Sequence, residues 1–238
     1  AISSNRPVTC DTAAPGSSGS DLDVENFNSR LVEQGFFNEM SVATFLYDLF
    51  DTGVDGSDND SIGFGPIYET MTGFQKNTEA FTTLFSFGTG LLQNVDPGDV
   101  AFVQSQLERE NVDTAGLDIW ATNQASQPTN WANGKPVRDL LPLYTELVPN
   151  GPTVNICVND DQVIEQDGNK PGEWRYLRFT TTSFRSWTLT VQANPVPPPT
   201  GDPDPTAVRD YADPDVRLYR NGTFLGSGLS PVEDREVF

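Results

Sequence analysis

The chain has 238 residues and a formal net charge of −20, and 36% of its residues are apolar, with 15 Phe, 6 Tyr and 4 Trp among its aromatic residues. This length allows one large domain or two of ordinary size, and the aromatic side chains can build a core, so the composition excludes a disordered chain. The negative charge excludes nucleic acid as a partner, because its phosphate backbone would be repelled, and argues against anionic membrane surfaces.

The N-terminal part is predicted to be an arm followed by a strong helix. Residues 1–26 are rich in Ser, Gly, Asp and Pro and show no periodic apolar face, which indicates irregular structure. After a short helix or turn from Phe27 to Phe37, apolar residues recur at steps of three and four and predict a helix that Asn38 or Ser41 can cap. These apolar residues are Val42, Phe45, Leu46, Leu49 and Phe50.

An acidic loop, DTGVDGSDND, ends this helix, since glycine and aspartate favour turns. A second ordered element follows, with Ile62, Phe64, Ile67 and Met71 as its apolar positions. Asn77 or Thr78 can cap a further helical segment, and Asp96-Pro97-Gly98-Asp99 predicts a turn and N-cap before a helix with Val100, Phe102, Val103 and Leu107 on its apolar face. The SQLEREN sequence at its end is expected to face solvent. We therefore predict a mostly α-helical domain of residues 27–150.

Residues 151–238 are predicted to form an antiparallel β-sandwich of the jelly-roll kind, so the expected fold class is α+β. TVNICV, WRYLRFTTT, SWTLTVQA and DVRLYRNG alternate apolar and polar residues, and proline-rich turns and the hairpin signal RNGT separate them. Residues 235–238 are expected to open another strand that has no partner following it. Either the polypeptide continues, or something covers this edge, including a second copy of the chain.

The chain has two cysteines, Cys10 and Cys157, and no histidine. Their spacing suits neither a CxxC redox site nor a zinc knuckle, so we predict a disulfide in an oxidising compartment, with two buried free thiols as the alternative. Without histidine, Ser-His-Asp catalysis, Cys-His catalysis and any His-based zinc site built by this chain alone are excluded.

The acidic loop is a candidate calcium site. Asp51, Asp55, Asp58 and Asp60 lie within ten residues, with glycines between them. Calcium prefers such oxygen ligands on a flexible loop, and it would relieve the repulsion between the carboxylates. The spacing does not fit an EF-hand loop, and a solvated acidic loop without metal is the alternative.

Other candidates carry weaker signals. A second acidic set beside the strand DVRLY can bind metal or can serve turn formation and edge protection: Asp202, Asp204, Asp210, Asp213 and Asp215.

Glu39 with Tyr47 and Asp48 could act as an acid–base group, although their spacing places Glu39 and Asp48 on different faces of a helix, and capping or surface roles are the alternative. Ser41 has no histidine or lysine near it in sequence. Asn59 and Asn221 begin glycosylation sequons, which are frequent by chance.

A family resemblance rests on NEMSVATFLYDLFD, SIGFGPIYETMTG, KNTEAFTTLFSF and the helix ending in LERENV. Together these segments resemble the C-terminal part of secreted bacterial zinc metallopeptidases of the gluzincin type, in which an HExxH helix comes first. The resemblance covers residues 35–115. NKPGEWRYLRFT and ADPDVRLYRNG are similar to the pre-peptidase C-terminal type of β-sandwich module that is appended to such peptidases.

The chain departs from that family at the metal site, because a zinc peptidase needs two His and a Glu on the metal and a second Glu to activate water. No catalytic residue is therefore carried over. The resemblance implies a secreted or cell-surface protein whose zinc-binding part, like any export signal, precedes Ala1. Two hypotheses remain: the chain completes such a metallopeptidase by packing against its upstream catalytic portion or another chain, or it is a catalytically inactive extracellular assembly subunit. No apolar run of about 18 residues predicts a membrane span.

Overall fold

The computed structural model describes residues 8–11, 20–23, 35–52, 60–125, 141–156, 175–182, 186–193, 215–229 and 235–237. The fold is mixed α+β, as predicted, and it divides into two compact units, residues 1–180 and residues 181–238. The predicted division into an arm of residues 1–26 and domains of residues 27–150 and 151–238 stays a prediction. Within the part of the chain just listed, no helix has both the length and the apolar character that crossing a membrane requires.

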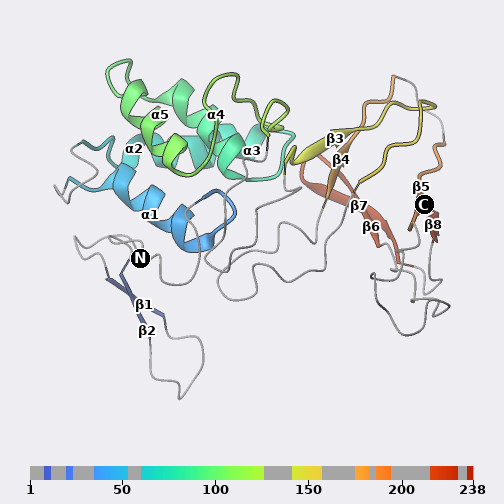
Figure 1. Ribbon diagram of the computed structural model, residues 1–238, viewed down its shortest axis with the longest axis horizontal. Coiled ribbons are helices and arrows are strands. Elements are labelled where there is room, and N and C mark those ends of the chain that lie inside the picture. The colour runs from blue at the N-terminus through green and yellow to red at the C-terminus, as the bar shows by residue number, and fades with distance from the viewer. Residues whose placement is uncertain are drawn as a thin grey trace, which may run out of the picture. The chain divides into compact units, whose positions relative to one another are not determined.

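The first unit contains the helices and four of the strands (Figure 1). The helical elements are α1 (Glu39–Phe50), α2 (Phe64–Glu69), the π-helical segment η1 (Thr70–Phe74), α3 (Gln75–Asn77), α4 (Leu84–Asn94) and α5 (Val100–Arg109). The strands are β1 (Val8–Asp11), β2 (Ser20–Asp23), β3 (Tyr144–Glu146) and β4 (Tyr176–Arg178). β1 and β2 pair antiparallel, so the prediction that residues 1–26 are irregular is wrong for these eight residues.

The hydrophobic core lies where α1, α2, α4 and α5 meet. Each large apolar side chain that is fully buried there contributes about 2 kcal/mol of transfer free energy. These side chains are Phe45, Leu49, Phe85, Leu91, Val103, Leu107 and Val112.

The predicted helix after Asn38 is confirmed as α1. Asn38 caps it, because the side-chain oxygen of Asn38 accepts a hydrogen bond from the backbone N–H of Ser41 at 3.4 Å. The apolar residues expected to face the core do so: Phe45 and Leu49 are fully buried, and the other three pack partly buried against them.

α2, η1 and α3 follow one another without a break and form one helical stretch, Phe64 to Asn77, with a π-helical turn in the middle. Ile67 is buried against the core on the inner side of this stretch. The ring of Phe74 lies against α4 at Gly90, so closely that a Cβ atom on Gly90 would be 2.6 Å from Phe74 Cγ. Only glycine leaves room for this approach.

α4 begins after Thr83, and not after Asn77 or Thr78 as the sequence suggested. Thr83 and Ser86 form a capping box: Thr83 Oγ1 accepts the backbone N–H of Ser86 at 3.2 Å, and Ser86 Oγ accepts that of Thr83 at 3.0 Å. A serine thus takes the place usually held by Glu or Gln in this motif. Asn77 instead ends α3, and Thr78 is its C-cap residue.

α5 follows the predicted turn, in which the backbone N–H of Asp99 donates to the carbonyl of Asp96 at 2.9 Å. Val103 and Leu107 face the core as predicted. The expectation that the end of this helix faces solvent is wrong for Gln106 and Glu110, which are only 3% and 2% exposed. Glu110 accepts a hydrogen bond from Ser41 of α1, and Gln106 accepts one from Arg109 of its own helix, α5. The contact with Ser41 joins residues far apart in the sequence, so spacing alone does not reveal it.

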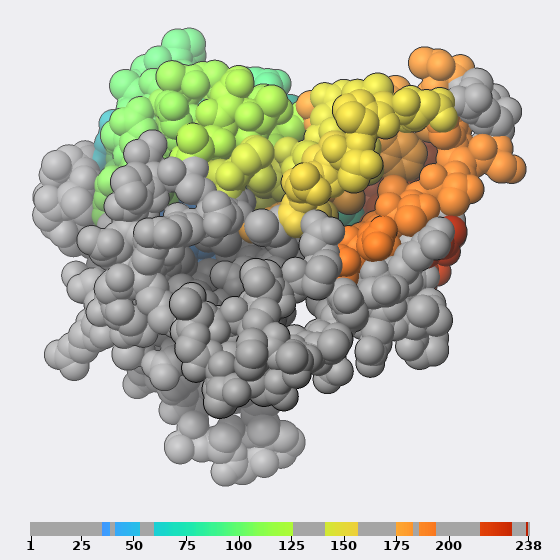
Figure 2. Space-filling view, turned by 45° about the vertical axis from the view of Figure 1, so that its right-hand side comes forward, coloured from blue at the N-terminus to red at the C-terminus, as the bar shows by residue number. Residues whose placement is uncertain are grey.

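β3 and β4 pair in parallel, from Tyr144 opposite Tyr176 to Glu146 opposite Arg178. Tyr144 packs edge-on against Trp120 of the preceding loop, with ring centroids 4.9 Å apart. Figure 2 shows the green and yellow parts of the chain lying against each other. The contact between Tyr144 and Trp120 attaches the strand pair to the helices.

The second unit contains two antiparallel strand pairs. Its strands are β5 (Thr190–Gln192), β6 (Val216–Arg220), β7 (Thr223–Gly228) and β8 (Arg235–Val237). The predicted hairpin is confirmed: β6 and β7 are joined by Asn221 and Gly222, whose φ angles of 48° and 73° are those of a two-residue hairpin turn.

The other strand predictions for residues 151–238 have different outcomes. The strand expected at residues 235–238 is present as β8, and its partner is β5, which precedes it in the chain; the expectation that no partner follows it stays a prediction. Residues 153–156 of the predicted strand TVNICV are irregular, which corrects that prediction. A sandwich of packed sheets stays a prediction, because the described strands pair only in twos.

The close contact between Phe74 and Gly90 predicts opposite effects for two Gly→Ala substitutions. Gly90→Ala should lower the free energy of unfolding by about 1 kcal/mol, because overpacking against Phe74 outweighs the gain in helix propensity. Gly73→Ala, in a position of η1 where an added Cβ meets nothing within 4 Å, should raise it by about 0.5–1 kcal/mol. Urea unfolding measures both, and a stabilising Gly90→Ala would contradict the packing described here.

Candidate functional site

The predicted calcium ligands are only partly within the described residues. Asp51 follows α1 and is half-buried, and Asp60 is exposed, with its Oδ1 accepting the backbone N–H of Ser61 at 2.9 Å. Asp55 and Asp58 lie outside the described residues. Among the residues that the structure describes, no group of three His, Cys, Asp or Glu side chains is placed to hold a metal ion. The calcium site and the solvated loop both stay predictions.

The predicted disulfide and the weaker candidates are also only partly covered. Cys10 lies in β1, whereas Cys157 is outside the described residues, so their pairing stays a prediction. Asp215 is exposed just before β6, and the other members of the second acidic set are outside the described residues. Asn221 is exposed at the tip of the β6–β7 hairpin, and Asn59 is outside.

The acidic and hydroxyl residues of α1 hold α1 against α5. Ser41 Oγ donates a short hydrogen bond to Glu110 Oε2 and accepts the backbone N–H of Gly35 at 2.8 Å. Asp48 forms an ion pair with Arg109, with its Oδ2 3.1 Å from Arg109 Nη1. Ser41, Asp48 and Glu110 are all buried, and the hypothesis of an acid–base group at Glu39, Tyr47 and Asp48 stays a prediction. The side chain of Glu39 lies outside the described residues.

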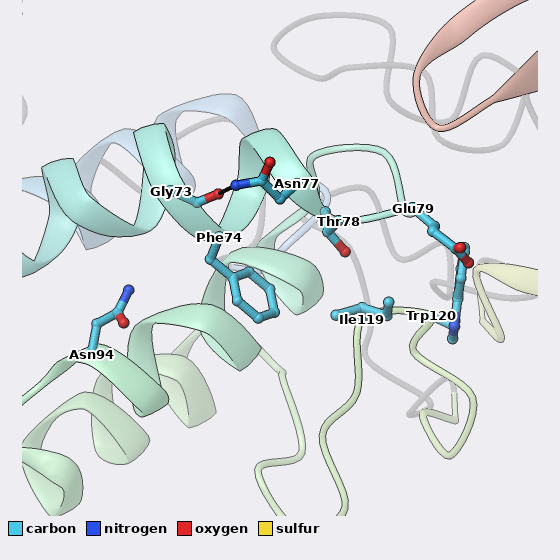
Figure 3. A pocket seen from close by; sticks show the side chains of 8 residues that line it. All are labelled: Gly73, Phe74, Asn77, Thr78, Glu79, Asn94, Ile119 and Trp120. Carbon is cyan, nitrogen blue, oxygen red and sulfur yellow. Dashed lines mark hydrogen bonds between the residues drawn. The ribbon is translucent and has the colours of Figure 1, made fainter.

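A pocket of about 550 Å³ lies between the end of the Phe64–Asn77 stretch, the end of α4 and the loop before β3 (Figure 3). Its lining residues are Gly73, Phe74, Asn77, Thr78, Glu79, Asn94, Ile119 and Trp120. The pocket is wide open to solvent rather than enclosed, and its walls combine aromatic rings with polar groups.

Three polar residues of the pocket, Asn77, Asn94 and Thr78, differ in the hydrogen bonding of their side chains. Asn77 Nδ2 donates to the carbonyl of Gly73 at 2.7 Å, and Asn94 Nδ2 donates to Thr70 Oγ1 at 3.0 Å. Thr78 Oγ1 is buried and has no hydrogen-bond partner among the residues that the structure describes, although a buried hydroxyl without a partner costs free energy. Figure 3 shows this hydroxyl pointing between Phe74 and Ile119.

An aromatic cluster supports the Trp120 side of the pocket. Trp120 packs against Tyr144, which packs against Tyr176 with ring centroids 5.1 Å apart. The guanidinium of Arg178 lies 5.2 Å from the centroid of the Trp120 ring and is also paired with Glu146 at 3.1 Å. The Tyr144 hydroxyl accepts the backbone N–H of Phe81 at 2.8 Å.

Burial raises the pKa of Tyr144 to about 12 from 10.0. The hydrogen bond from the backbone of Phe81 acts in the opposite direction, and the neighbouring Tyr176 adds a smaller upward effect. The hydroxyl is therefore neutral at all physiological pH values, and Tyr144 serves to fix the cluster rather than to transfer protons.

The outer side of the Phe64–Asn77 stretch carries exposed apolar side chains. Phe64, Tyr68 and Met71, which we call the outer stripe, are 50%, 55% and 47% exposed. They are four and three residues apart, so they follow one side of the helix, and the rings of Phe64 and Tyr68 are 5.8 Å apart. Residues 61–75 contain a single charged residue, Glu69, although the whole chain has a net charge of −20.

Sequence reasoning did not find the pocket or the outer stripe. Trp120 and Phe74 are far apart in the sequence, and no spacing rule joins them. The low charge of residues 61–75 was the available signal for the outer stripe, since core positions of protein interfaces are depleted in charge and enriched in aromatic residues and Met.

Comparison of the chain with protein-family models, with curated proteins and with solved structures finds no match.

The raised pKa of Tyr144 predicts how stability depends on alkaline pH. Because the pKa is about 12 in the folded chain and 10.0 is its ordinary value, the unfolded chain loses this proton first, so the contribution is complete below pH 10 and falls as the pH rises toward 12. The Tyr144→Phe substitution removes the ionisable hydroxyl of residue 144, and with it this pH-dependent contribution to stability, and it removes no other ionisable group. The difference in unfolding free energy between wild type and Tyr144→Phe should shrink by about 1.4 kcal/mol from pH 9 to pH 11 in urea unfolding. A difference that stays constant would contradict the assignment.

Proposed function

We propose that this chain is the C-terminal, non-metal-binding part of a secreted zinc metallopeptidase-like protein. Its helices would pack against an upstream catalytic portion, and residues 151–238 would form an accessory β-sandwich. The observation that carries the proposal is the outer stripe, an exposed apolar face on a chain that is otherwise strongly acidic.

The outer stripe has the composition of an interface core. Phe64, Tyr68 and Met71 are of the residue types enriched in such cores, and a contiguous exposed apolar patch commonly marks a site of protein contact. The segment SIGFGPIYETMTG, which contains the stripe, is also one that carries the family resemblance. The proposed occupant is therefore an apolar surface of the HExxH-containing portion.

This chain alone cannot build a His-based zinc site. The sequence has no histidine, and no group of metal-binding side chains is found in the described part. In the proposal, zinc and the glutamate that activates water belong to the other portion, and this chain supplies shape and packing. The Cys10–Cys157 disulfide and calcium binding by the acidic loop belong to the same proposal of a secreted protein.

A second function, an extracellular assembly subunit without peptidase activity, is favoured by the second unit. Exposed apolar side chains occur on its strand pairs and next to them: Tyr219, Phe224, Leu225, Leu229 and Val237. Two-stranded pairs have open edges that can pair with strands of another copy.

Photo-crosslinking from the outer stripe distinguishes these functions. A photoreactive phenylalanine analogue replaces Tyr68, or Val148 as a control that is 62% exposed but lies away from the stripe, in protein produced in its native host. We expect position 68 alone to crosslink to polypeptide that contains HExxH, in material that contains zinc by elemental analysis.

The other outcomes are equally informative. Crosslinks from position 68 to a second copy of this chain, in material without zinc, would favour the assembly subunit. Equal, weak crosslinking from positions 68 and 148 would show that the outer stripe is not a docking face and would overturn the proposal.

A further inference from the structure

The pocket beside Phe74 and Trp120 has walls suited to a ligand with a flat or extended apolar part. Phe74 and Trp120 contribute aromatic rings, and Ile119 contributes an aliphatic side chain (Figure 3). Phe74 is fixed by its contact with Gly90, and Trp120 by its contact with Tyr144. The walls are therefore held in place before any ligand arrives, which reduces the entropy lost on binding.

The polar groups of the pocket favour a positive charge. Glu79 contributes an exposed carboxylate, and none of the lining residues is basic. The pocket also lies at the C-terminal end of the Phe64–Asn77 helical stretch, where the backbone carbonyls carry partial negative charge. The nearest basic residue along the stretch, Lys76, is exposed and is not among the lining residues.

The aromatic walls favour the same kind of ligand. Cations are attracted to the faces of Trp and Phe rings. The guanidinium of Arg178, which is paired with Glu146, already lies 5.2 Å from the centroid of the Trp120 ring, so the charge of the ligand is placed at Glu79 and not over Trp120. The amide oxygen of Asn94, whose Nδ2 is already bonded to Thr70, is an acceptor on the opposite side of Phe74 from Glu79 (Figure 3).

We propose that this pocket binds an organic cation, a protonated amine or guanidinium on an apolar stem, as in a lysine or arginine side chain. The stem lies between Phe74, Ile119 and Trp120, and the charge lies near Glu79. This site does not depend on the proposed metallopeptidase relationship, because it is built from residues of this chain alone.

Calorimetric titration of the full chain tests the site at 150 mM salt, where long-range attraction to the acidic surface is screened. The probes are N-acetyl-arginine amide, its neutral isostere N-acetyl-citrulline amide, and butylguanidine, which carries the same single charge without a peptide backbone. We expect the arginine derivative to bind at least tenfold more tightly than the citrulline derivative. If butylguanidine binds as tightly as the arginine derivative, a free organic cation is sufficient, and if it does not bind, the site requires the peptide backbone of an arginine or lysine residue.

Two matched variants separate the site from the general charge of the chain. Glu79→Gln should weaken binding of N-acetyl-arginine amide about threefold to tenfold, whereas Glu69→Gln, which removes one exposed carboxylate from the same helical stretch outside the pocket, should change it less than twofold. Both positions are exposed, so both variants should fold, which circular dichroism checks. Equal affinity for arginine and citrulline derivatives, or equal weakening by both variants, would overturn the proposal.

Discussion

The close approach of Phe74 to Gly90 is the contact on which the helical unit and its candidate sites depend. In this contact the inner side of the Phe64–Asn77 stretch packs against α4, and the ring of Phe74 leaves no room for a Cβ atom at Gly90. The π-helical turn η1 ends at Phe74, so the ring reaches α4 while it also forms a wall of the pocket. π-Helical turns inside α-helices are frequent at functional sites.

One helical stretch therefore presents two different surfaces. Its outer side carries Phe64, Tyr68 and Met71, which suit contact with an apolar protein surface. Its C-terminal end contributes Phe74 and Thr78 to a pocket whose aromatic rings and carboxylate suit a cation. The acidic character of the chain as a whole adds a long-range attraction for positively charged ligands, and salt weakens it.

The sequence predicted those elements whose signals are local. The apolar spacing after Asn38 and the Asn221-Gly222 turn are each read within a few residues, and both are confirmed. Spacing could not decide which side of the Phe64–Asn77 stretch is buried, because apolar residues occur on both sides. It also suggested that Glu110 faces solvent, since charged residues usually do. Glu110 is buried because Ser41, 69 residues away, donates to its carboxylate. The pocket depends on similar long-range packing.

Hydrogen–deuterium exchange of the full chain tests the central claim most directly, namely that the Phe64–Asn77 stretch is held from its inner side while its outer side stays exposed. Backbone amides that are packed against a core exchange slowly, and those of loosely held segments exchange quickly. The account predicts that amides from Ile67 to Asn77 exchange as slowly as those of α4. Exchange in this stretch as fast as in the irregular segment at residues 153–156 would contradict it.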